Sequence, residues 1–133
     1  MSIETGALVG LDGLPIYWHL PPGRNAGYLP DSQDLWSHIW KDRDVLQGFA
    51  HSHPGFGTPS PSWEDLTTFS AIEKALGKRL TWWIITANQV AEYTWSGPGT
   101  YDYIGCVLPY DTSQLVWLDQ LHSNSYEEDI AHG

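Results

Sequence analysis

The chain has 133 residues, a length typical of one domain with room for a hydrophobic core. Its formal net charge is -10 and no basic stripe stands out, which argues against binding to a nucleic-acid backbone. Eight tryptophans argue against disorder, and no apolar run approaches the ~20 residues that span a bilayer. The single cysteine excludes an internal disulfide, and the N-terminus lacks a signal-peptide pattern, so we expect a cytoplasmic protein without membrane segments.

Local patterns predict the elements of the first half of the chain. Residues 3–9 and 14–20 read as a hairpin around the turn signal Asp12-Gly13. Asp31 or Ser32 can cap a helix that reaches about residue 43. Residues 45–50 are apolar or small throughout, as expected for a central strand.

The second half begins with a helix from Ser62 to residue 76, which Gly77 would end. Residues 80–87 are the strongest strand, with Trp82 and Trp83 on opposite faces, and 90–95 would complete a hairpin with it. Residues 101–108 are expected as a strand with Cys106 buried, and 113–121 as a short helix. The order indicates one α/β domain over residues 1–122, followed by an acidic, disordered tail over 123–133.

The candidate chemistry lies in the central stretch 51–65. His51 and His53 are two residues apart at the end of a strand, a spacing that places both side chains on one face. Asp65 lies in the first turn of the next helix, from where its carboxylate can return as a third ligand. Imidazole and carboxylate suit zinc, and three protein ligands leave a fourth position for water, as in catalytic zinc sites.

Each part of this stretch also has a purely structural interpretation. A lone His-x-His is usually a surface or core feature, and Ser62-x-x-Asp65 is close to a capping box with Asp in place of Glu. The metal interpretation is favoured by the conjunction, because strand, histidine pair, Gly/Pro loop, serine and aspartate follow one another at short spacing.

Residues 51–65 carry a resemblance to a known family. His51-Ser-His53-Pro, a Gly/Pro loop and Ser62-x-x-Asp65-Leu are similar to the JAMM motif of the MPN-domain zinc metalloproteases, especially the compact prokaryotic branch. Residues 3–10 are similar to the family segment that carries a glutamate, here Glu4. The resemblance spans residues 4 to about 95 and implies that His51, His53 and Asp65 bind zinc. It further implies that Ser62 supports the oxyanion and Glu4 is the general base.

Three departures from the family pattern leave alternatives open. The loop between Pro54 and Ser62 has seven residues, one more than the commonest pattern, so Ser60 competes for the serine role. Only Ser62 keeps the three-residue step to Asp65. The Glu4 segment is one residue shorter than usual. The helix that usually precedes this segment is missing, so that side of the sheet is open or is covered by a partner or by the C-terminal region.

The resemblance implies a single MPN (JAMM, cytidine-deaminase-like) α/β domain, in which helices flank a curved mixed sheet. The implied activity is zinc-dependent hydrolysis of the amide after the C-terminal glycine of a ubiquitin-like protein, released from a lysine or a peptide extension. The implied partners are that protein, its conjugates or fusions, and the associated activating and conjugating enzymes, as in bacterial antiphage defence operons. Alternatives are a JAMM-type peptidase of phage-tail assembly or sulfur-carrier processing, and a non-catalytic MPN interaction module.

Overall fold

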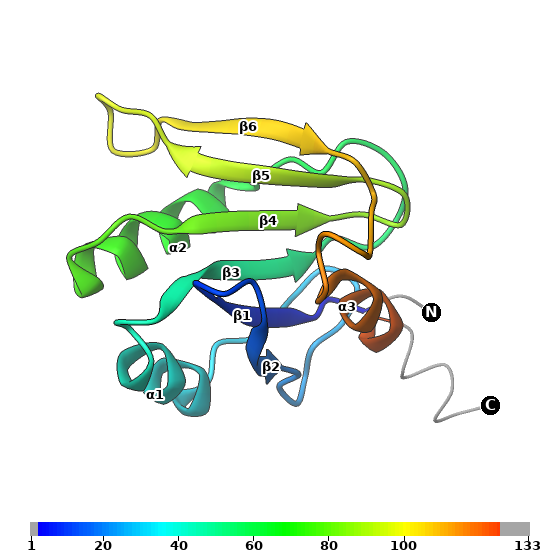
Figure 1. Ribbon diagram of the computed structural model, residues 1–133, viewed down its shortest axis with the longest axis horizontal. Helices are drawn as coiled ribbons and strands as arrows, with labels where there is room; N and C mark the ends of the chain where they lie inside the picture. The colour runs from blue at the N-terminus through cyan, green and yellow to red at the C-terminus, as the bar shows by residue number, and fades with distance from the viewer. Residues whose placement is uncertain (1–2, 126–133) are drawn as a thin grey trace.

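The structure, a computed structural model, describes residues 3–125 as a mixed α/β arrangement with one six-stranded sheet and three helices (Figure 1). This confirms the predicted α/β class. The strand order across the sheet is β2-β1-β3-β4-β5-β6. The strands are β1 (Gly6–Gly10), β2 (Pro15–His19), β3 (Leu46–Ser52), β4 (Thr81–Ile85), β5 (Val90–Trp95) and β6 (Tyr103–Leu108). The helices are α1 (Gln33–Lys41), α2 (Trp63–Leu76) and α3 (Leu118–Asn124).

The centre of the sheet is its one parallel pair, β3 with β4, while the remaining neighbours are antiparallel. A parallel pair needs a crossover, and here α2 provides it. At this pair the backbones approach closely, because a Cβ built on Gly48 would lie 1.7 Å from the carbonyl oxygen of Thr81. Glycine at this position therefore lets β3 pair closely with β4.

The helices cover both faces of the sheet. Apolar side chains of α1 and α2 pack with Leu8, Trp82 and Ile84 on one face. On the other face α3 and the preceding turn pack against Ala7, Ala50 and Trp83. The two adjacent tryptophans thus lie on opposite faces, as predicted. The C-terminal helix α3 therefore covers the face of the sheet that carries Ala7 and Ala50.

The caps confirm the predicted start of α1 and both predicted ends of α2, while α1 ends at Lys41, before the expected residue 43. The Oγ atom of Ser32 accepts a hydrogen bond from the backbone of Leu35 at 3.0 Å. Ser62 caps α2 in the same manner, and Gly77 ends that helix with a left-handed φ of 67°. Because α2 begins at a fixed residue, the side chains of its first turn face the end of β3.

The last helix differs from the prediction in both of its ends. Residues 113–117 are not in the helix, because Asp111 accepts hydrogen bonds from the backbone and hydroxyl of Ser113 and holds a turn. The helix then continues to Asn124, past residue 123, where the tail was expected to begin. Asn124 and Ser125 are buried, so these residues belong to the packed domain. The rest of the predicted tail, 126–133, lies outside the described residues.

The prediction that Cys106 is buried is wrong, because the structure exposes it. Strand β6 is an edge strand, and Ile104, Cys106 and Val107 on it are all exposed. None of the helices within residues 3–125 is long and apolar enough to cross a membrane.

Candidate metal centre

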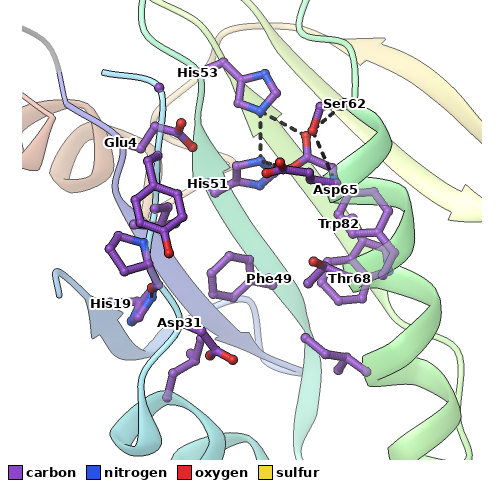
Figure 2. A pocket seen from close by; sticks show the side chains of 18 of the residues that line it. Glu4, His19, Asp31, Phe49, His51, His53, Ser62, Asp65, Thr68 and Trp82 are labelled. Carbon is purple, nitrogen blue, oxygen red and sulfur yellow. Dashed lines mark hydrogen bonds and ion pairs between the residues drawn. The ribbon is translucent and has the colours of Figure 1, made fainter. Parts of the chain in front are cut away.

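Two histidines at the C-terminal end of β3 lie beside a carboxylate in the first turn of α2 (Figure 2). His51 is the penultimate residue of β3 and His53 follows the strand directly, so both rings leave the same face. Their Nε2 atoms are 3.0 Å apart. Asp65 reaches both, with Oδ1 3.2 Å from the Nε2 of His51 and Oδ2 3.0 Å from the Nε2 of His53. The structure therefore brings the three predicted ligands to one point.

Glu4 approaches the same pair of histidines. A carboxylate oxygen of Glu4 and one ring nitrogen each of His51 and His53 lie within 4.8 Å of one another, close enough to hold a metal ion. Figure 2 places Glu4 and Asp65 on opposite sides of the two rings. The family resemblance implied proton transfer for Glu4 and metal binding for Asp65, and the structure places both carboxylates near the histidine pair.

The donor atoms fit a tetrahedral metal centre. Zinc binds nitrogen and oxygen at about 2.0–2.1 Å, so tetrahedral ligands lie about 3.3 Å apart. The two Nε2 atoms lie 3.0 Å apart, and each lies 3.0–3.2 Å from one oxygen of Asp65, slightly closer than in such a centre. Two imidazoles with carboxylate oxygens form a donor set of the kind that zinc accepts. The residues can therefore hold a metal ion with this ligand chemistry.

Asp65 also closes the capping box of α2. Its Oδ2 accepts a hydrogen bond from the backbone of Ser62 at 2.9 Å, while its own backbone donates to the Ser62 Oγ at 3.0 Å. The structural interpretation of Ser62-x-x-Asp65 is thus confirmed, and the same carboxylate nevertheless reaches both histidines. The Ser62 hydroxyl acts as an acceptor in this box, which leaves its proton for another acceptor.

Ser62 and its competitor Ser60 differ in where they lie. Ser62 lines the cavity beside the histidines, and Ser60 is not among the described residues that line it. Trp63 follows Ser62 and lines the same cavity, with 64% of its surface exposed and its ring edge-on to Tyr101. The position of Ser62 therefore agrees with the three-residue step to Asp65 that favoured it.

The surroundings shift the pKa values of the two carboxylates in opposite directions. Burial raises the pKa of Glu4, although the nearby histidines oppose the shift. Burial also acts to raise the pKa of Asp65, but hydrogen bonds from His51 and His53 outweigh it and hold that pKa far below its usual range. The pKa of His53 is raised because its bond to Asp65 outweighs the effect of burial. One carboxylate is therefore suited to carry a proton and the other to stay ionised.

Glu4 is fixed by segments that the sequence did not connect with it. The guanidinium of Arg24 donates to the backbone oxygen of Glu4 at 3.0 Å, and the backbone of Glu4 donates to Asn25 at 2.9 Å. The preceding residue, Ile3, donates to the backbone oxygen of Ser125 at 2.8 Å. Neither Arg24 nor Ser125 belongs to a recognisable motif, so no signal in one sequence could have identified these supports.

A cavity of about 770 Å³ opens beside the candidate metal centre. Its lining includes Glu4, His51, His53, Ser62 and Asp65, then continues between the loop 26–31 and α2 towards the start of α1. The part of the cavity beyond these five residues was not predicted, although the alternation in β3 that aligns Phe49 with His51 was a usable signal.

His19, which the sequence left without a role, also lines this cavity and is 2% exposed. Its Nε2 donates to the backbone oxygen of Pro30 at 2.7 Å. Burial lowers the pKa of His19, although this bond opposes the shift. His19 therefore helps to hold the loop 26–31 that forms one wall.

No protein-family model and no curated protein matches the chain. The relationship to the JAMM proteases therefore stays a prediction that rests on the motif around His51, His53 and Asp65.

Proposed function

We propose that the chain is a zinc-dependent metallohydrolase of the JAMM type that cleaves amide bonds. The observation that carries the proposal is the convergence of His51, His53 and Asp65 within 3.0–3.2 Å, with the carboxylate of Glu4 on the other side of the histidines. A helix cap needs only Ser62 and Asp65, so the two imidazoles and the second carboxylate need a further explanation. Metal-assisted hydrolysis supplies one.

Each side chain has a role in the proposed reaction. Zinc, when bound, polarises the scissile carbonyl and lowers the pKa of a water to about 7. Glu4 takes a proton from the attacking water as the new C–O bond forms, and delivers it to the amine nitrogen as the C–N bond breaks. The Ser62 hydroxyl donates to the carbonyl oxygen as that oxygen gains negative charge, an interaction worth about 3 kcal/mol. His51, His53 and Asp65 hold the metal.

The direction of the pKa shifts supports this division of roles. A general base works best when its pKa lies near the working pH, and burial moves the pKa of Glu4 in that direction. A carboxylate that binds a metal must be ionised, and the hydrogen bonds from His51 and His53 keep Asp65 ionised. The finer parts of the proposal, an MPN-type fold and a ubiquitin-like protein with a C-terminal glycine as substrate, are supported by the motif resemblance alone.

Metal content and cleavage test the proposal separately. Purified wild-type protein is expected to bind one equivalent of zinc, and His53→Ala to lose it, while the control His38→Ala, on α1, retains it. A ubiquitin-like protein fused to a reporter is then offered to zinc-loaded protein, chelated protein and Glu4→Gln, with Asp44→Asn as an exposed-carboxylate control. We expect cleavage only by zinc-loaded wild type and Asp44→Asn.

Two results would contradict the proposal in different ways. Unchanged metal content in His53→Ala would remove the metal centre. Chelator-sensitive cleavage that persists in Glu4→Gln would keep the metal centre and remove Glu4 from proton transfer.

A further inference from the structure

We propose that the cavity beside the metal centre binds a large apolar side chain on one of the two residues joined by the scissile amide. The inference rests on the proposed function, because Glu4, His51, His53 and Asp65 line the cavity and form its reacting end. At about 770 Å³ the cavity lies within the 300–1,000 Å³ typical of sites that enclose a small ligand.

Aromatic rings form the floor of the cavity directly next to the histidines. Phe49 precedes His51 by two residues on the same face of β3, and the two ring centroids are 6.1 Å apart. Trp82 lies beside Phe49 and stacks on Phe69 with a centroid separation of 4.3 Å, which fixes its orientation. Figure 2 shows Phe49 and Trp82 extending the cavity away from the metal-binding end. Trp82 and Phe69 are buried behind Phe49, so Phe49 is the ring that favours an apolar occupant in contact with the reacting amide.

The rim of the cavity leaves further aromatic surface exposed. Tyr28 on the loop 26–31 is 54% exposed, and Trp36 on α1 is 37% exposed. The indole Nε1 of Trp36 donates to Asp31 Oδ2 at 2.7 Å, which ties α1 to that loop. A side chain that entered the cavity would cover this surface, and removing apolar area from water would favour its binding.

The charges around the cavity restrict what can enter. Four carboxylates line it, those of Glu4, Asp31, Glu64 and Asp65, and none of the described lining residues is lysine or arginine. An acidic side chain would meet electrostatic repulsion from these four groups. The occupant is therefore large, apolar and free of negative charge.

Binding to metal-free protein tests the cavity independently of catalysis. The probes are acetyl-Gly-Gly-X-Gly-Gly-amide peptides in which X is Phe, Leu, Gly or Glu, measured by isothermal calorimetry. The Phe and Leu peptides are expected to bind at least tenfold more tightly than the Gly and Glu peptides. Ala71→Phe, at an exposed cavity-lining position of α2, should reduce this preference to threefold or less. Ala75→Phe, one turn further along α2 and outside the lining, is the matched control and should leave the preference unchanged.

Cleavage of the same peptides by zinc-loaded protein separates this inference from the proposed function. We expect mass spectrometry to find cleavage at an amide next to Phe or Leu. Equal binding of the Phe and Gly peptides within threefold, or a preference that Ala71→Phe leaves intact, would overturn the inference about the cavity. Chelator-sensitive cleavage that is as fast for Gly as for Phe would also overturn it, while supporting the metallohydrolase. Selective binding without cleavage of any substrate would instead overturn the metallohydrolase.

Discussion

Glu73 is a buried carboxylate, and its removal should lower the free energy of unfolding because it joins α2 to β4 and β6. Its side chain is 2% exposed and lies on α2, below the turn that supplies Asp65. One oxygen accepts from the Trp82 indole at 2.8 Å and from the Leu80 backbone at 3.0 Å. The other accepts from Tyr103 at 2.6 Å and from Arg79 at 2.9 Å. Four donors from β4, β6 and the α2–β4 connection thus converge on one side chain.

The size of the effect follows from what each substitution leaves unpaired. Glu73→Gln keeps one acceptor oxygen for the Trp82 and Leu80 donors, but it weakens these bonds and loses the half-exposed Arg79 pair. We expect a loss of about 2 kcal/mol in the free energy of unfolding, since a bond to a charged group is worth about 1.5–3 kcal/mol and a neutral bond about 1. Glu73→Leu leaves both buried N–H donors without a partner, each at about 1–3 kcal/mol, so we expect about 4 kcal/mol.

Urea unfolding of metal-free protein, followed by tryptophan fluorescence, measures both losses. In thermal unfolding, with an entropy of about 2 cal/mol/K per residue, a loss of 1 kcal/mol lowers the Tm of this chain by about 3–4 °C. The Tm should therefore fall by about 7 °C in Glu73→Gln and by about 14 °C in Glu73→Leu. Asp44→Asn, which removes an exposed carboxylate, should stay within about 0.5 kcal/mol of wild type. A Glu73→Leu protein as stable as wild type would refute the reasoning, because relief of carboxylate burial would then outweigh the lost bonds.

Three further predictions concern the cavity and its reacting end. In metal-free protein, Asp65→Asn should destabilise most between pH 3.8 and 6.5, the unfolded pKa values of Asp65 and His53. Because the pKa of Asp65 is lowered in the folded protein, its contribution to the free energy of unfolding is lost as pH falls, and because that of His53 is raised, its contribution is lost as pH rises. Urea unfolding from pH 3 to 8 would contradict this if wild type and Asp65→Asn differed by the same free energy at every pH. His19→Gln keeps a donor for the backbone oxygen of Pro30. Because the pKa of His19 is lowered in the folded protein, wild type should lose stability as pH falls below 6.5, and the variant should lose less. The prediction fails if the free energy of unfolding depends on pH equally in both proteins. Arg24→Met removes the hydrogen bond to the backbone oxygen of Glu4 and should lower kcat about tenfold with unchanged zinc content and KM. A rise in KM alone would assign Arg24 to substrate binding.

The elements that could be predicted are those specified by adjacent residues. Strand β5 has the predicted bounds, and α2 begins and ends at the cap residues that the sequence supplies. The convergence of His51, His53 and Asp65 was predictable for the same reason, because strand alternation and a helix cap fix all three within a short stretch. Their proximity follows from local geometry, because only the short loop 54–61 separates the end of β3 from the start of α2.

The parts that could not be predicted depend on segments far apart in the chain. The exposure of Cys106 depends on β6 lying at the sheet edge, which its own sequence does not reveal. The supports of Glu4 come from residues 24, 25 and 125, and the cavity needs the loop 26–31 to stand opposite α2. Such contacts depend on tertiary packing, whereas periodicity and capping residues predict only local elements.

The shared carboxylate of Asp65 has a consequence for the thermodynamics of metal binding. A flexible ligand must surrender its rotational freedom when it binds an ion, and that loss lowers affinity. Here the formation of α2 has already restricted the Asp65 side chain through its bond to the Ser62 backbone. The entropy of that ligand is therefore lost during folding, before any ion arrives. A substitution that loosens the first turn of α2 would weaken metal affinity even where every donor atom is kept.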